Sequence, residues 1–140
     1  MFQVQPVRSR ELQKELSDLI GCPFFENTYA FFAAELTDDA KEITSVIALC
    51  QFSYAPEEAV IRSVGIMPGS EKDEAVTVLV RAVTAFLNRA EIPRVYADEE
   101  AASPEMLKGW SFRKTEDGRL GIDLAKFYKS PCRYEKEIHE

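Results

Sequence analysis

The chain has 140 residues, of which 46% are hydrophobic and 29% charged, with a formal net charge of −7. This length allows one domain with a real hydrophobic core. The acidic balance argues against a nucleic acid or an anionic membrane as partner, because both attract clustered Lys and Arg. No apolar run approaches the ~20 residues that cross a bilayer, and the sequence starts without the apolar segment of a signal peptide.

The cysteines indicate the compartment and argue against a metal site. Cys22, Cys50 and Cys132 are odd in number and widely spaced, and none is near the single histidine, His139. Zinc sites need closer groups of Cys and His. We therefore expect reduced thiols in a cytoplasmic protein that holds no metal, with Cys50 as a small core residue.

The first half of the chain predicts a strand, a helix and a hairpin. Alternation predicts a strand over 2–7. Ser9 can cap a helix that starts near Arg10 and ends at Gly21. Aromatic and β-branched residues then predict two paired strands over 29–36 and 43–54.

A central strand over 59–67 and a long helix come next. Gly65 inside the strand marks a bulge or a close backbone approach. Strict alternation places Arg62 and Val64 on one face, where Arg62 can pair with a carboxylate across the sheet. After the Pro68-Gly69 turn, Ser70 with Asp73 fits a capping signature for a helix from residue 71 to residue 91.

The last third predicts a closing part of the same sheet. A strand over 93–97 after the long helix implies a right-handed parallel crossover. Ser103 and Pro104 predict the start of a short helix through Lys108, and the last strand is expected over 120–128. We expect a single domain over 1–132, followed by a charged tail over 133–140.

In this order the elements resemble the GNAT family of acetyl-CoA-dependent N-acetyltransferases. The segments that carry the resemblance are 64–68, the helix from Glu71, and 108–114, and together the likeness covers roughly residues 1–130. It implies an α/β fold with a mixed, splayed central sheet flanked by helices. It also implies acetyl-CoA as the only cofactor and a small-molecule or peptide amine as the acceptor.

The resemblance also implies which positions would hold the cofactor. The segment from Val64 resembles the strand end where the family's backbone groups meet the pantetheine arm, and the helix start resembles the pyrophosphate cradle. The positions are Val64, Gly65, Ile66, Glu71, Lys72, Asp73, Glu74, Ala75 and Val76.

Long charged side chains replace the glycines of this cradle. In alignment from Pro68, Glu71 falls at the family's Arg position, and Lys72 and Glu74 fall at its two glycine positions. Glycine lets the backbone approach the phosphates. A carboxylate ~5 Å from a phosphate costs about 3 kcal/mol at an effective dielectric of 20, and Lys72 can offset one such contact.

Candidate acids and bases are few. The family's general-acid Tyr falls at Leu107 if Ser111-Phe112 is the family's Gly-Phe pair, or at Glu105 if Gly109-Trp110 is that pair. A general base needs a carboxylate that faces the splayed sheet. Glu57, Glu58 and Glu35 are candidates for this base, and each is also explained as a solvated charge of a turn or strand end. Glu105 is a candidate for proton transfer, but a carboxylic acid is mostly ionised at pH 7 unless it is buried.

Three functions stay open on the sequence alone. The order of the elements favours an N-acetyltransferase. The acidic loop and the missing Tyr favour a catalytically silent GNAT-derived binding or regulatory module that does not bind CoA in the usual way. The adjacent aromatics Phe24 and Phe25, or the sheet edges, fit a module that homodimerises.

Overall fold

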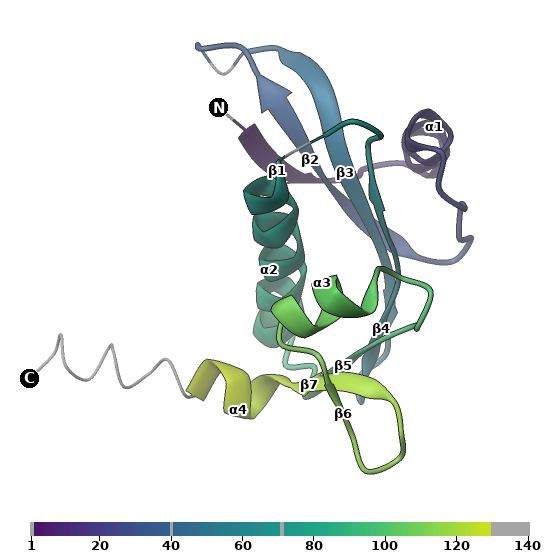
Figure 1. Ribbon diagram of the computed structural model, residues 1–140, viewed down its shortest axis with the longest axis vertical. Coiled ribbons are helices and arrows are strands. Elements are labelled where there is room, and N and C mark those ends of the chain that lie inside the picture. Colours follow the sequence, from purple (N-terminus) through teal and green to yellow (C-terminus); the bar gives the residue numbers. More distant parts are fainter. Residues whose placement is uncertain (1, 40, 71, 130–140) are drawn as a thin grey trace, which may run out of the picture.

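The computed structural model describes residues 2–39, 41–70 and 72–129. Within these residues seven strands form one mixed sheet, in the order β1-β2-β3-β4-β5-β7-β6 (Figure 1). The neighbouring strands are antiparallel except for β4 and β5, which are parallel as the predicted crossover requires. The fold is the expected α/β fold with a mixed sheet between helices.

The strand and helix bounds follow the predictions in most places. The strands are β1 (Phe2–Pro6), β2 (Tyr29–Leu36), β3 (Ile43–Tyr54), β4 (Ala59–Ile66), β5 (Arg94–Ala97), β6 (Arg113–Lys114) and β7 (Leu120–Asp123). The helices are α1 (Arg10–Ile20), α2 (Asp73–Arg89), α3 (Pro104–Gly109) and α4 (Leu124–Lys129).

Helices α1 and α3 begin at the caps that the sequence predicts. The Ser9 hydroxyl accepts a hydrogen bond from the Leu12 N–H at 3.1 Å, and the Ser103 hydroxyl accepts one from the Met106 N–H at 3.2 Å. Gly21 ends α1 with a φ of 88°, a conformation that favours glycine. Local side-chain chemistry therefore fixes both helix starts and one helix end.

The start of α2 differs from the prediction. The helix begins at Asp73, so the expected start at Glu71 is wrong, and Glu71 itself lies outside the described residues. The Ser70 hydroxyl accepts from the Lys72 N–H at 3.4 Å, inside the turn, and Lys72 is the N-cap. Ser70 is not the helix cap because its hydroxyl serves the turn itself.

The end of the chain also differs. The predicted strand over 120–128 is wrong beyond Asp123, where helix α4 begins. The Asp123 carboxylate accepts from the Lys126 N–H at 3.2 Å, and Leu124 is fully buried. A short apolar run cannot distinguish a strand from a buried helix turn, and here a capping aspartate favours the helix.

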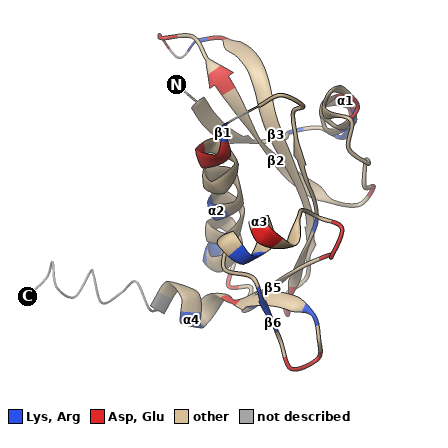
Figure 2. Cartoon of the chain, in the orientation of Figure 1, with Lys and Arg blue, Asp and Glu red and all other residues tan. Residues whose placement is uncertain are grey.

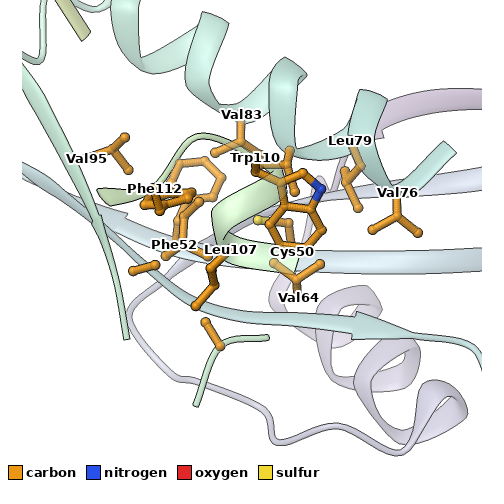
Figure 3. Packing of buried hydrophobic residues seen from close by; sticks show 14 of the residues in the cluster. Cys50, Phe52, Val64, Val76, Leu79, Val83, Val95, Leu107, Trp110 and Phe112 are labelled. Atoms are coloured by element: carbon orange, nitrogen blue, oxygen red, sulfur yellow. The ribbon is translucent and has the colours of Figure 1, made fainter. Parts of the chain in front are cut away.

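The two faces of the sheet carry separate hydrophobic clusters. Helices α2 and α3 pack on one face, where Val76, Leu79, Leu107 and Trp110 meet strand residues such as Phe52 (Figure 3). Helix α1 packs on the other face through Leu16 and Ile20, which lie against Phe32 and Leu49. The sheet therefore has buried side chains on both faces.

Candidate functional site

Strands β4 and β5 pair over a short length, and the pairing stops where β5 ends at Ala97. Their register pairs are Ala59 with Val95, Val60 with Tyr96, and Ile61 with Ala97. Beyond Ile61 the edge of β4 that faces away from β3 no longer pairs with β5. We call this stretch of the β4 edge without a β5 partner the splay, because it lies where the GNAT resemblance implies one.

A β-bulge lies just before the splay. Opposite β3, Gln51 pairs with Ser63 and Phe52 pairs with Ile61, so Arg62 is the extra residue. The extra residue shifts the alternation, and Val64 joins Ile61 in the core under α2. The predicted strict alternation, which puts Ile61 and Val64 on opposite faces, is therefore wrong.

Gly65 marks a close backbone approach rather than the bulge. A Cβ atom added to Gly65 would lie 2.6 Å from the Cys22 Sγ and 3.1 Å from the Ile20 Cγ2. Cys22 belongs to the connection between α1 and β2, so this connection lies directly on β4. Partial burial raises the pKa of the Cys22 thiol, although a hydrogen bond with Ser63 opposes the shift.

A tight turn between β5 and α3 fills the start of the splay; we call residues 98–101 the strap. The Asp98 N–H donates to the Ile61 carbonyl at 3.0 Å, and the Ala101 N–H donates to the Asp98 carbonyl at 2.9 Å. The Val64 N–H then donates to the Ala101 carbonyl at 2.8 Å. Ala101 is only 3% exposed, so the strap is packed against the β4 edge.

An ion pair lies across the same opening. The Arg62 guanidinium contacts the Asp98 carboxylate at 3.2 Å and 3.4 Å, and both side chains are 39% exposed. This confirms the prediction that Arg62 pairs across the sheet. Exposed pairs of this kind contribute at most about 1 kcal/mol and weaken with salt.

The candidate acids and bases do not gather at the splay. Glu57 is exposed in the turn before β4, at the strand end that still pairs with β5. The Glu58 carboxylate holds Arg119 at 2.9 Å, and the Arg119 guanidinium lies 3.5 Å from the centre of the Tyr96 ring. Glu105 is exposed in the first turn of α3. Asp98 is the carboxylate that the chain places beside the opening.

The proposed cradle positions divide between solvent and core. Asp73 and Glu74 are exposed in the first turn of α2, which is red in Figure 2, whereas Ala75 and Val76 are buried. The Lys72 ammonium lies 3.3 Å from the Glu35 carboxylate. Lys72 therefore pairs with Glu35 of β2. Its charge offsets that carboxylate and not the carboxylates of Asp73 and Glu74 in α2.

A hollow of ≈ 540 Å³ lies beside the turn that leads into α2. Its lining includes Ile47, Met67, Pro68, Ser70 and Lys72. It lies between the first half of β3 and the turn that precedes α2. The turn is therefore open to solvent on this side, next to the first-turn N–H groups of a 17-residue helix.

The backbone indicates which residues occupy the family's Gly-Phe position. Ser111 has a φ of 78°, a left-handed conformation that favours glycine, and Phe112 after it is buried. Ser111-Phe112 therefore matches the pair, and the Tyr position falls at Leu107. Leu107 is 1% exposed inside the core and has no proton to donate.

We expect Ser111→Gly to raise the free energy of unfolding by about 0.5–1 kcal/mol, because it removes the strain of a left-handed serine. Urea denaturation measures the change. Ser45→Gly is the matched control in strand β3 at an exposed position, and it should lower stability by a similar amount. A loss of stability in both variants would contradict the match of Ser111 to the glycine of the family's Gly-Phe pair.

Burial disfavours the thiolate form of both described cysteines. Burial raises the pKa of the Cys50 thiol to about 12, and this side chain lies in the core between α2 and the sheet (Figure 3). This confirms Cys50 as a core residue.

Cys132 and His139 lie outside the described residues. In the described part of the chain, no group of three or more His, Cys, Asp or Glu side chains is placed to hold a metal ion.

Sequence reasoning missed the residue that fixes the connection between α1 and β2. Gln51 is fully buried in β3, and its amide binds the backbone of Pro23 and Phe25 and the side chain of Gln13. A glutamine between Cys50 and Phe52 in an apolar strand was the available signal, because a buried amide needs partners. The aromatics Phe24 and Phe25 are partly buried here, and a homodimer through them stays a prediction.

Solved structures of acetyltransferases are similar to this chain. The NatC complex bound to Gag peptide and CoA aligns with a TM-score of 0.64 at 11% identity, over 87% of this chain and 98% of that chain. A chimeric spermidine N-acetyltransferase from Vibrio cholerae and hSSAT aligns with a TM-score of 0.63 at 10% identity, over 91% and 98%.

A third structure agrees with these two. The ribosomal-protein-S18-alanine N-acetyltransferase from Escherichia coli aligns with a TM-score of 0.60 at 12% identity, over 86% of this chain and 89% of that chain. No protein-family model and no curated protein matches the sequence. The fold of the chain is therefore that of the GNAT acetyltransferases.

A search of the described helices found none with the length and apolarity needed to cross a membrane.

Proposed function

We propose that this chain is an N-acetyltransferase that binds acetyl-CoA between β4 and β5 and acts on a small-molecule or peptide amine. The end of β4–β5 pairing at Ile61, which leaves the rest of the β4 edge without a strand partner on that side in a GNAT fold, carries this proposal. The β4 edge from Val64 to Ile66 and the first-turn N–H groups of α2 would hold the cofactor. Acetyl-CoA would supply the thioester whose acetyl group passes to the amine nitrogen.

The exposure of the α2 carboxylates removes much of the electrostatic objection to this site. Asp73 and Glu74 are exposed and face solvent. At a dielectric near 80, a carboxylate ~5 Å from a phosphate costs about 0.8 kcal/mol, roughly a quarter of the cost at a dielectric of 20. Several such contacts weaken a micromolar complex, worth about 8 kcal/mol, without abolishing it.

A catalytically silent binding or regulatory module is the second candidate. Two observations favour it: Leu107 stands at the Tyr position, and the Val64 N–H is already bound to Ala101. In this case the fold would present a surface to a partner and no acetyl group would move. The two candidates differ in one measurable property, the affinity for acetyl-CoA.

Calorimetric titration with acetyl-CoA at low and moderate salt separates the two candidates. We expect micromolar binding that tightens roughly 3-fold to 10-fold in Glu74→Lys, because a positive charge replaces a negative one near the phosphates. Glu42→Lys is the control, since it makes the same charge change at an exposed position after β2. It should leave the affinity unchanged.

Binding should be accompanied by thiol release when a panel of primary amines is added. No heat of binding at either salt concentration, for the natural chain or for either variant, would rule out the acetyltransferase and leave the silent module.

A further inference from the structure

We infer that the strap, residues 98–101, is an autoinhibitory contact that occupies the β4 edge and must leave before acetyl-CoA can lie there. The inference rests on the proposed function. In Figure 1 the strap lies in the loop between β5 and α3, beside β4. It is formed by this chain's own backbone and needs no partner.

The hydrogen bonds show that the strap takes the place of an extended ligand. In an antiparallel strand, successive N–H groups point to opposite sides. The Met67 N–H donates to Ile47 of β3 at 2.8 Å, whereas the Val64 N–H donates to the strap at 2.8 Å. Val64 and Ile66 therefore direct their N–H groups away from β3. The strap accepts the hydrogen bond of the Val64 N–H through the Ala101 carbonyl.

The strap is continuous with β5 but does not extend it as a strand. The Asp98 N–H still follows the β5 pattern by donating to Ile61, and the chain then turns within residues 98–101. The Ala101 carbonyl accepts a hydrogen bond from β4 just beyond the last residue of β4 that pairs with β5. A carbonyl oxygen of acetyl-CoA that accepts a hydrogen bond from the Val64 N–H would have to displace the Ala101 carbonyl.

Two backbone hydrogen bonds to β4 and few side-chain contacts hold the strap closed. Ala101 contributes one buried methyl group, and the Arg62 to Asp98 pair is 39% exposed on both sides. Glu99 and Glu100 are exposed at the tip of the turn, which is red in Figure 2. Segments with few buried contacts open most readily, and β5 and α3 on either side anchor the strap while it moves.

Closure lowers the apparent affinity for any ligand of the β4 edge. The measured dissociation constant equals the intrinsic one divided by the open fraction. A strap that is open a tenth of the time weakens binding roughly tenfold. Loosening the strap should therefore tighten binding even though no ligand contact is added.

Amide hydrogen exchange tests the closed strap without any ligand. The Val64 amide should be protected in the natural chain and should exchange roughly 2-fold to 5-fold faster in Asp98→Ala and Arg62→Ala, the factor that corresponds to the loss of an exposed ion pair. The Gly65 amide, which points to β3, should keep its rate in all variants. Glu99→Ala is the matched control, because it removes an exposed carboxylate of the strap without touching the ion pair. A Val64 amide that exchanges as fast as an exposed amide in the natural chain would overturn the inference.

The same variants are then titrated with acetyl-CoA. We expect Asp98→Ala and the gentler Asp98→Asn to tighten binding by about the factor by which Val64 exchange accelerates, and Glu99→Ala to leave it unchanged. If the natural chain binds and these variants bind no tighter, the autoinhibitory role is wrong while the proposed function stands. If nothing binds although Val64 exchange accelerates, the proposed function fails, and the autoinhibitory role fails with it.

Discussion

Gln51→Leu is expected to lower the free energy of unfolding by roughly 2–3 kcal/mol, because it leaves backbone groups of the α1–β2 connection without partners. The Gln51 Oε1 accepts from the Phe25 N–H at 2.9 Å and from the Gln13 Nε2 at 2.8 Å. The Gln51 Nε2 donates to the Pro23 carbonyl at 2.8 Å. Leucine fits the buried space but makes none of these bonds.

Urea denaturation followed by two independent probes measures this loss. Gln3→Leu is the matched control, since Gln3 is exposed on β1 and only accepts from the Gln5 side chain. It should change stability by no more than about 0.5 kcal/mol. A loss for Gln51→Leu that is as small as this control would mean that water satisfies the freed backbone groups.

Signals carried by neighbouring residues predicted most of the fold. Ser9, Gly21, Ser103 and Pro104 act within one helical turn of their own position, so the sequence alone locates α1 and α3. The hairpin and the parallel crossover follow from strand patterns and their order. The same order supports the GNAT resemblance, which the structural comparisons confirm as a fold.

Contacts between distant residues account for the parts that the sequence did not predict. The position of the strap depends on how far β5 extends beside β4. The residues around Ala101 in the sequence do not indicate that its carbonyl accepts a hydrogen bond from the Val64 N–H. The bulge at Arg62 depends on the register with β3 and changes which face Val64 lies on. The candidate bases Glu57 and Glu58 precede the central strand in the sequence, and the direction of β4 puts them at the end of this strand away from the splay.

The α2 start shows how a local signal can be correct in type and wrong in place. Ser70 does use its hydroxyl to accept a backbone hydrogen bond, but the donor is Lys72 in the turn. Gly69 has a φ of 82°, which lets the chain turn before the helix begins. The carboxylates of Asp73 and Glu74 then lie in the first helical turn, where they stabilise the positive end of the helix.

Gly65→Ala is expected to lower the free energy of unfolding by about 1–3 kcal/mol, the usual cost of an added methyl group in a packed site. The new Cβ would lie 2.6 Å from the Cys22 Sγ and 2.9 Å from the Cys22 Cβ, so the α1–β2 connection must shift away from β4. Gly109→Ala is the matched control in α3, where nothing lies within 4 Å of an added Cβ. It should cost no stability, because alanine favours a helix over glycine.

A double-mutant cycle tests whether Cys22 is the cause. In a Cys22→Ala background the sulfur is absent, and Gly65→Ala should lose about 1 kcal/mol less than it loses in the natural chain. The remaining loss comes from the Cys22 Cβ and from the Ile20 Cγ2, which stays 3.1 Å from the new methyl group. Strict additivity of the two changes would place the strain elsewhere and would mean that Gly65 is not needed to seat the connection on β4.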